Sequence, residues 1–248
     1  MSDPSPHAVL TLPVDIPRIT STSENSDLNY FGPVNDELPI EASKHIARVT
    51  DGVEEEVAHT LKAFLEITQS DCVGNAEEKK CCWFTVRSQK PTDEFLIPRW
   101  HQDGRMYTYD EGREDVVRSK YALVILGPPT LMLVPDEQSF AFERQAVSKF
   151  KWWWEDEDAP SPPLGEREDA DLKLRKCLEN EFKDSPKVHV GHGQVVRFSW
   201  GRDNSPIHSE PHFDCDRIFI SVLYGSESEL RYMADLRDVE YEKYEVEL

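Results

Sequence analysis

The residues with the clearest chemical potential are two histidines and an aspartate. His101 and Asp103 are two positions apart in the chain, and the residues around them are rich in strand formers. Residues two apart on a strand face the same side, so this imidazole and this carboxylate could bind one ion. His208, from a distant strand, would complete a set of two histidines and one carboxylate. Such a set leaves coordination positions open on Fe(II).

Other histidines offer competing choices for the distal ligand. His212 lies four residues after His208, and with Asp214 it forms a second His-x-Asp pair. We expect that second pair to lie in a solvated loop, but His212 remains an alternative to His208. His189 and His192 flank a glycine and fit a turn better than a metal site.

The segments that must position these residues change period along the chain. From Pro39 to Gln69, apolar residues recur every three to four positions, which predicts helices divided at Gly52. From Cys82 onward the period is two, which predicts many short strands. The expected strands are 82–87, 95–97, 106–109, 121–126, 131–134, 188–190, 195–200 and 217–224. We therefore expect a mainly β chain with a helical cap (α+β), in which the strands form a barrel or jelly roll.

Composition suggests four regions along the chain. Residues 1–35 are rich in Pro, Ser, Asp and Asn and predict a flexible arm, although its apolar residues could still form a short strand. Residues 36–80 would form the helical cap, 81–230 the catalytic domain and 231–248 a tail. An acidic, proline-rich insertion at 151–186 would be exposed and would end in a short helix. Its three tryptophans, Trp152–Trp154, would either pack the insertion on the domain or form a substrate lid.

Charge and composition restrict the partners and the compartment. The 248 residues carry a formal net charge of −20, with a pI near 4.8. This makes nucleic acid an unlikely partner and argues against an anionic membrane, because both require many basic residues. The chain has no run of about twenty apolar residues, and we expect no targeting signal. Its five cysteines lack CxxC spacing, so we expect no disulfide framework or zinc knuckle and a cytoplasmic or nuclear protein.

Four short stretches in order resemble a known family signature. They are Trp100-His101-Gln102-Asp103-Gly104, Gly193-Gln194-Val195-Val196-Arg197-Phe198, Ile207-His208-Ser209-Glu210-Pro211 and Arg217-Ile218-Phe219-Ile220-Ser221. In this order they resemble the Fe(II)/2-oxoglutarate-dependent dioxygenases, over roughly residues 80 to 225. That resemblance implies a double-stranded β-helix (a cupin-like jelly roll) with the N-terminal helices packed on one face.

The resemblance also implies roles for particular residues. His101, Asp103 and His208 would be the iron ligands, and Arg217 would bind the distal carboxylate of 2-oxoglutarate. The side-chain chemistry fits, because a guanidinium can hold a carboxylate through two parallel hydrogen bonds. The interval from His208 to Arg217 is short for the family, so other residues remain open for the carboxylate. Those alternatives are Arg197, Lys120 and Tyr121, while Arg87, Tyr107 and Tyr109 could line the pocket.

The expected function is therefore an Fe(II)- and 2-oxoglutarate-dependent oxygenase. It would couple conversion of 2-oxoglutarate to succinate with oxidation, expected to be hydroxylation, of an unidentified small-molecule or protein substrate. A cupin-like protein could use the same ligands with Zn or Mn for non-oxidative chemistry. A non-catalytic interaction domain is the second alternative, because the acidic insertion and the tail from Asp235 to Leu248 could contact a partner protein.

Overall fold

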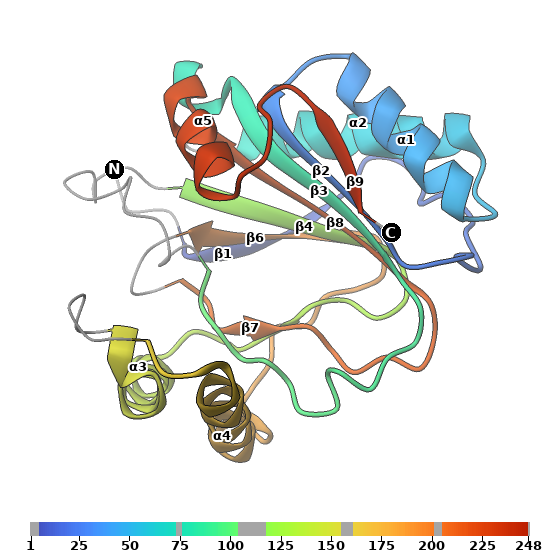
Figure 1. The fold of residues 1–248 in the computed structure, drawn as a ribbon. Coiled ribbons are helices and arrows are strands. Elements are labelled where there is room, and N and C mark those ends of the chain that lie inside the picture. The colour runs from blue at the N-terminus through green and yellow to red at the C-terminus, as the bar shows by residue number, and fades with distance from the viewer. Residues whose placement is uncertain (1–4, 73–75, 104–117, 155–160, 201–204, 248) are drawn as a thin grey trace.

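The centre of the molecule is a large antiparallel sheet. The structure is a computed structural model and describes residues 5–72, 76–103, 118–154, 161–200 and 205–247. Within these ranges, seven strands pair in the order β1-β6-β4-β8-β3-β2-β9, as Figure 1 shows. The strands are β1 (His7–Thr11), β2 (Ser26–Pro33), β3 (Cys81–Gln89), β4 (Arg118–Leu126), β6 (Gln194–Trp200), β8 (Arg217–Gly225) and β9 (Tyr244–Glu247).

Two helices cover one face of this sheet. They are α1 (Glu37–Val49) and α2 (Glu54–Asp71), which confirms the prediction of helices over Pro39–Gln69 divided near Gly52. Their apolar stripes pack against the sheet to form the main core. Fully buried members from the helices include Leu38, Ile46, Val57, Leu61 and Phe64, and members from the sheet include Phe84, Val86, Leu123, Ile220 and Val222.

The opposite face of the sheet is more polar, and strand periodicity explains why. On β8 the residues Ile218, Ile220 and Val222 face the helices and belong to the main core. The alternating residues Arg217, Phe219 and Ser221 line a cavity on the other face. The sheet thus separates the core beneath α1 and α2 from a face whose polar and aromatic side chains line a cavity.

A second, two-stranded sheet is made of β5 (Leu131–Met132) and β7 (His208–Ser209). In Figure 1, β7 lies on the side of the large sheet that α1 and α2 leave uncovered. Isolated bridges extend this small sheet, pairing His101 with His208 and Leu133 with Lys187. The small sheet therefore joins the two segments that carry the candidate histidines.

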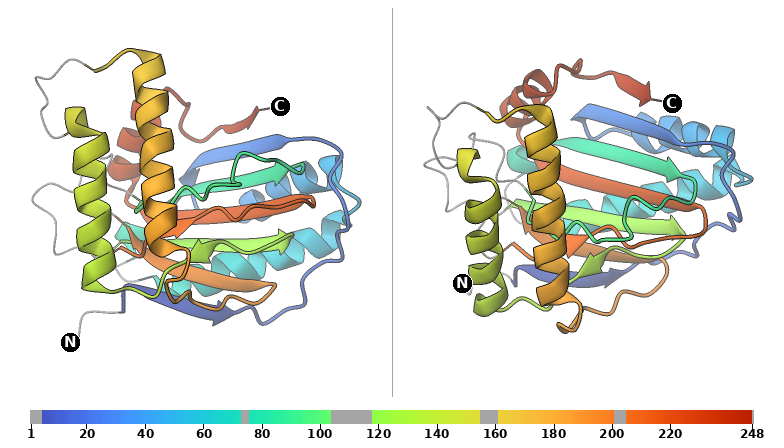
Figure 2. Two further views of the ribbon diagram at one scale, coloured as in Figure 1. Left: turned by 90° about the horizontal axis from the view of Figure 1, so that it is seen from below. Right: turned by 60° about the horizontal axis from the view of Figure 1, so that its bottom comes forward.

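Two further helices support the small sheet. They are α3 (Glu137–Phe150) and α4 (Leu164–Phe182), which lie side by side with their axes across the strands in Figure 2. They share a second core with residues next to the candidate ligands: Trp100, Leu133, Phe140, Ala146, Leu174, Leu178, Phe182 and Ile207. The last helix, α5 (Glu227–Leu236), packs with Trp83, Trp200 and Leu223 in a third core. Short 3-10 turns are η1 (Glu77–Lys79) and η3 (Trp152–Trp154).

Several expectations from the sequence are wrong in detail. The expected arm contains β1, which is the short strand that its apolar residues left open, and also β2, which was not expected. Leu28, Tyr30 and Phe31 of β2 are buried despite the polar composition around them. The expected tail contains most of α5 and all of β9. Residues 95–97 and 188–190 are not strands, and the expected strand at 106–109 lies outside the described residues.

The insertion also differs from the prediction. It contributes the long helix α4, which packs through Leu174, Leu178 and Phe182, and its partner α3 was not expected from the sequence. Trp152 and Trp154 are exposed, so the prediction that they pack against the domain is wrong for these two. The five cysteines are free thiols. In the part of the chain that the structure describes, no helix has the length and apolar character to cross a membrane.

Candidate metal centre

The two candidate histidines are direct cross-strand neighbours. The amide of His101 donates to the carbonyl of His208 at 3.0 Å, and the reverse bond measures 2.9 Å. This antiparallel pairing brings their rings to a centroid distance of 4.4 Å. Because side chains of directly paired residues project to the same face, the backbone itself holds both imidazoles beside each other.

Asp103 completes a compact cluster with these histidines. One carboxylate oxygen lies 3.4 Å from Nε2 of His101, and the other lies 3.5 Å from Nε2 of His208. One ligand atom from each residue lies within 4.8 Å of the others, and Asp103 and His208 are buried. Bound ligands about 2 Å from an ion would sit roughly 3 Å apart, so a small inward movement would close the set around a metal. The structure thus brings together the three residues that the sequence singled out.

Hydrogen bonds orient both imidazoles toward the centre of the cluster. Nδ1 of His101 donates to the carbonyl of Arg99 at 2.6 Å, and Nδ1 of His208 donates to the carbonyl of Pro206 at 3.1 Å. A carbonyl can only accept, so each Nδ1 carries a proton, which leaves Nε2 as the ring atom that would bind a metal. Burial, followed by the neighbouring His208, lowers the pKa of His101, which favours the neutral form that binds metals.

Lys120 is an additional member of the cluster. Its ammonium lies 2.6 Å from Oδ2 of Asp103. Burial alone would raise the pKa of Asp103, but Lys120, His208 and His101 together hold it well below its usual range. The ammonium also lies 5.3–5.8 Å from the ring centres of Trp83, Phe198 and Trp200. From the sequence, Lys120 was only an alternative partner for a bound carboxylate.

A second ion pair, between Arg99 and Glu210, lies next to the histidines and was not expected. The guanidinium of Arg99 lies 2.6 Å from the Glu210 carboxylate. Burial alone would raise the pKa of Glu210, but Arg99 and His101 outweigh it and lower the value to about 2. The antiparallel pairing of His101 with His208 explains the contact, because positions two before one residue face positions two after the other. The sequence alone does not contain this register, so the ion pair could have been predicted only after His101 and His208 were known to pair.

Arg217 is a buried cation held by neutral groups. It is 1% exposed. Its Nε donates to the carbonyl of Pro128 at 3.1 Å, and Nη2 donates to Oγ1 of Thr130 at 3.4 Å. Burial lowers its pKa to about 10, so the guanidinium stays charged at neutral pH. Among the residues that the structure describes, no carboxylate forms an ion pair with Arg217. The site can therefore accept an anion.

The residues considered as alternative partners for the 2-oxoglutarate carboxylate lie on different faces of the large sheet. Arg197 and Tyr121 are cross-strand partners on the helix-covered face, where both bind Asp71, at 3.1 and 2.9 Å. They cannot reach the cavity on the other face. Lys120 and Arg87 do line that cavity, whereas Tyr107 and Tyr109 lie outside the described residues.

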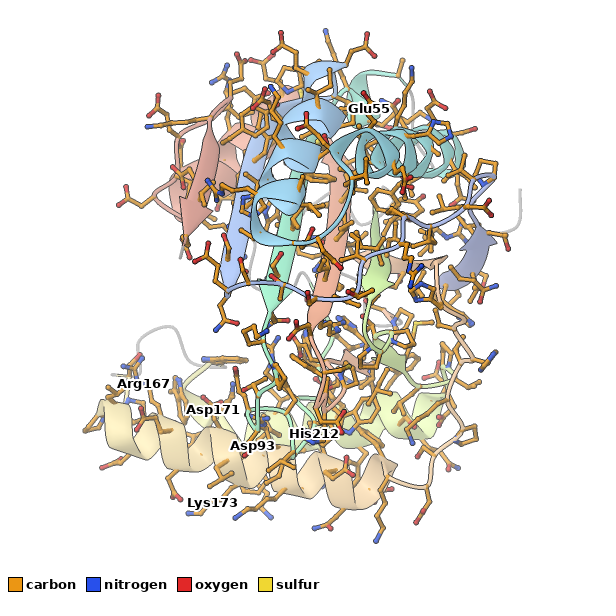
Figure 3. The ribbon with its side chains drawn as sticks, turned by 90° about the vertical axis from the view of Figure 1, so that its right-hand side faces the viewer. Glu55, Asp93, Arg167, Asp171, Lys173 and His212 are labelled. Carbon is orange, nitrogen blue, oxygen red and sulfur yellow. The ribbon has the colours of Figure 1, made fainter. Side chains whose placement is uncertain are left out.

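The remaining histidines lie outside the cluster. His212 is exposed, and Figure 3 shows it in the loop region next to α4, near Asp93. His189 and His192 are also exposed. Of the two choices for the distal ligand, the structure brings only His208 to His101 and Asp103.

The cluster and Arg217 line one cavity. Its volume is about 170 Å³, and Thr130, Phe219 and Ser221 also contribute to its walls. This is smaller than the roughly 300–1,000 Å³ of pockets for drug-sized ligands, so the cavity favours small molecules. A possible metal-binding set and a buried anion-binding group thus share one small enclosed space.

Comparison with known proteins assigns no family to this arrangement. No protein-family model matches the chain, and no curated protein matches it.

Proposed function

We propose that this protein is an Fe(II)- and 2-oxoglutarate-dependent oxygenase that oxidises a small substrate. One observation carries the proposal: two Nε2 atoms and a carboxylate converge in the same small cavity that contains a buried arginine, for which the described residues provide no ion pair. The first group suits a metal that keeps open positions, and the second suits the far carboxylate of a bound diacid.

The arrangement of the strands supports this proposal. The small sheet carries His208 and, through an isolated bridge, His101. The polar face of the large sheet contributes Lys120 and Arg217 to the same cavity. We interpret the two sheets as the two walls of a jelly roll, with the metal site on the smaller wall. In such a fold, ligands bind in the space between the walls.

Each residue would have a distinct task in the proposed site. His101, Asp103 and His208 would hold the metal on one side, because their donor atoms already converge. Arg217 and Thr130 would hold the distal carboxylate of 2-oxoglutarate through the guanidinium and the hydroxyl. Bound iron with its cosubstrate would supply the oxidising chemistry. The aromatic rings of Phe198 and Phe219 would limit access of water to the site.

Arg217 also separates this proposal from a cupin-like hydrolase or isomerase. Such a protein could use the same three ligands with Zn or Mn, but it would have no need for a fixed cation that binds a second carboxylate. The acidic insertion at 151–186 and the tail from Asp235 to Leu248 could contact a partner protein, yet an interaction surface alone does not account for the cluster of His101, Asp103 and His208.

The proposal is tested by following succinate formation from 2-oxoglutarate with purified protein, Fe(II) and oxygen. We expect slow succinate formation that requires Fe(II), even without the true substrate. Asp103→Ala should abolish it, because two neutral imidazoles hold Fe(II) weakly. His212→Ala is the matched control and should retain it. Succinate formation that survives in Asp103→Ala would contradict the proposal.

A further inference from the structure

The connection between the two sheets contacts the side chain of Arg217. The pairing of β4 with β8 shifts its register just before Leu126, as it does at a β-bulge. After Leu126 the chain leaves the large sheet and enters β5 of the small sheet. Between the two strands, Pro128 and Thr130 supply the carbonyl and the hydroxyl that hold the guanidinium. The connection therefore sets the direction of the Arg217 side chain.

Gly127 is the residue that allows this close approach. Its φ of 83° lies in the left-handed region, which favours glycine. A Cβ at this position would lie 2.7 Å from the carbonyl oxygen of Asp216 and 3.2 Å from Cα of Arg217. Both are backbone atoms, so a side chain at position 127 would push the connection away from β8. The carbonyl of Pro128 would then move relative to the guanidinium that it binds.

A second set of contacts fixes the same backbone through the side chain of Asp216. Its carboxylate accepts the amide of Thr22 at 2.8 Å and lies 2.9 Å from the Lys90 ammonium. Lys90 also donates to the carbonyl of Thr22 at 2.9 Å, so the three residues form one closed network. Thr22 precedes β2, and Lys90 directly follows β3. Segments that are distant in the sequence thus hold the position directly before Arg217.

These contacts leave the Arg217 side chain little freedom. Nε and Nη2 donate to Pro128 and Thr130, whereas Nη1 has no hydrogen bond among the residues that the structure describes. The side chain lies in the wall of the cavity that also contains the three candidate metal ligands. A side chain that is held before its ligand arrives loses less conformational freedom on binding. A preorganised guanidinium should therefore bind a carboxylate more tightly than a mobile one.

We propose that Gly127 and Asp216 are positioning residues for carboxylate binding, because they hold Arg217 in the orientation in which its guanidinium can receive the distal carboxylate of 2-oxoglutarate. This inference rests on the proposed function, since it takes Arg217 as the partner of the cosubstrate. Neither Gly127 nor Asp216 needs to touch 2-oxoglutarate, because both act through the backbone of residues 216 and 217.

The first test measures 2-oxoglutarate binding to the Mn(II)-loaded full chain by calorimetry. Gly127→Ala should weaken this binding about tenfold without changing the affinity for Mn(II), because the metal ligands lie on other segments. Gly193→Ala is the matched control, since Gly193 also has a positive φ, of 72°, and a Cβ there would meet the side chain of Ile16. It should bind 2-oxoglutarate as the wild type does, even where it lowers stability.

Substitutions at Asp216 test the second set of contacts in the same assay. Asp216→Ala should weaken 2-oxoglutarate binding about tenfold, because the network with Thr22 and Lys90 is lost. Asp216→Asn should recover part of the loss, since its amide oxygen can still accept the Thr22 amide. Asp214→Ala, at an exposed aspartate two positions earlier, should bind 2-oxoglutarate as the wild type does.

A second readout follows the position of Arg217 without any ligand. Hydrogen exchange at its Nε is measured by NMR on protein with isotope-labelled arginine. Exchange should be slow in the wild type, because this N–H donates to the carbonyl of Pro128 in a buried position. It should be about tenfold faster in Gly127→Ala and Asp216→Ala, and unchanged in Gly193→Ala.

Wild-type affinity for 2-oxoglutarate in both Gly127→Ala and Asp216→Ala would overturn the inference. An equal loss of affinity in Gly193→Ala, or unchanged exchange at Nε of Arg217 in all variants, would also overturn it. If the wild type binds no 2-oxoglutarate, but exchange becomes faster only in Gly127→Ala and Asp216→Ala, these two residues do position Arg217 and the proposed oxygenase function is wrong.

Discussion

At the scale of single residues, the most informative feature is the buried charge on Arg217. Among the described residues, its hydrogen bonds go to a carbonyl and a hydroxyl and its ring contacts to Phe213 and Phe219, so the guanidinium would gain strongly from a bound carboxylate. Its position at the start of β8, beside the cavity, makes it the residue on which cosubstrate recognition depends in the proposed function.

The first prediction concerns this recognition. Arg217→Gln should weaken 2-oxoglutarate binding on the order of 10², because one charge-assisted contact is lost. Arg217→Lys should recover only part, since an ammonium cannot present two parallel donors. Equilibrium binding to the Mn(II)-loaded protein measures both. Arg197→Gln serves as the control, because Arg197 pairs with Asp71 on the other face. If this control loses affinity while Arg217→Gln does not, the assignment is wrong.

The second prediction concerns Lys120 as a competitor of the metal. Its ammonium is bound to the carboxylate that a divalent ion needs, so the two cations repel each other. Lys120→Gln should raise the affinity for Mn(II) on the order of tenfold. The same variant should destabilise the metal-free protein by about 3–5 kcal/mol, because Asp103 loses its counter-ion.

Metal titration and thermal unfolding together test this pair of opposite effects. Lys62→Gln, an exposed lysine on α2, should change neither quantity. Lower metal affinity in Lys120→Gln would show instead that Lys120 positions Asp103 for the metal.

At the scale of elements, the helices support the site from outside it. Leu178 of α4 is 1% exposed and shares its core with Trp100 and Ile207, which directly precede His101 and His208. Leu178→Ala should destabilise the protein by about 2–5 kcal/mol through loss of contacts and formation of a cavity. It should also weaken metal binding, because both histidine segments lose support.

The control for this third prediction lies on the same helix. Leu172 is 42% exposed, so Leu172→Ala should change stability by less than about 0.5 kcal/mol. Denaturant unfolding and metal titration measure both variants. Equal effects of the two substitutions would show that α4 does not pack as the structure has it.

The fourth prediction concerns the pH dependence of stability, which we assign to His45 of α1. Burial, followed by the nearby Arg48, lowers the pKa of His45 to about 4 from an ordinary 6.5. Between these values the unfolded chain binds a proton that the folded chain does not, so stability falls as pH drops from about 6.5 to 4. The contribution is on the order of 2–3 kcal/mol. In unfolding experiments across this range, His45→Gln should flatten the dependence of stability on pH. The substitution His59→Gln, at an exposed histidine of α2, should leave it unchanged. A dependence unchanged in His45→Gln would contradict the assignment.

Particular elements show what the sequence could and could not predict. The spacing of His101 and Asp103 predicted that both side chains meet, and they do, although His101 forms only an isolated bridge and Asp103 lies in a bend rather than on a strand. Apolar periodicity was sufficient for α1 and α2. β2 was not expected, because Asn, Gly and Pro interrupt its run of apolar residues. Those apolar residues become buried when β2 pairs with β3 in the sheet. The contact between Lys120 and Asp103 depends on how two sheets face each other, which no local pattern encodes.

At the scale of the whole molecule, one sheet separates two environments. Its helix-covered face forms the main core, and its other face presents charged and aromatic side chains to the smaller sheet. The strongly acidic surface leaves the cavity as a region of concentrated positive charge. In the proposed function, the main core would stabilise the sheet, and the basic side chains on its other face would bind small anions.

The proposed function is tested most directly by anaerobic titration of the protein with Fe(II) and 2-oxoglutarate, followed by visible absorption. We expect a charge-transfer band that requires both additions, because metal and cosubstrate must share the site. The band should be absent in Asp103→Ala and present in His212→Ala. A wild-type protein that shows no band at saturating Fe(II) and 2-oxoglutarate would show that the proposed oxygenase function is wrong.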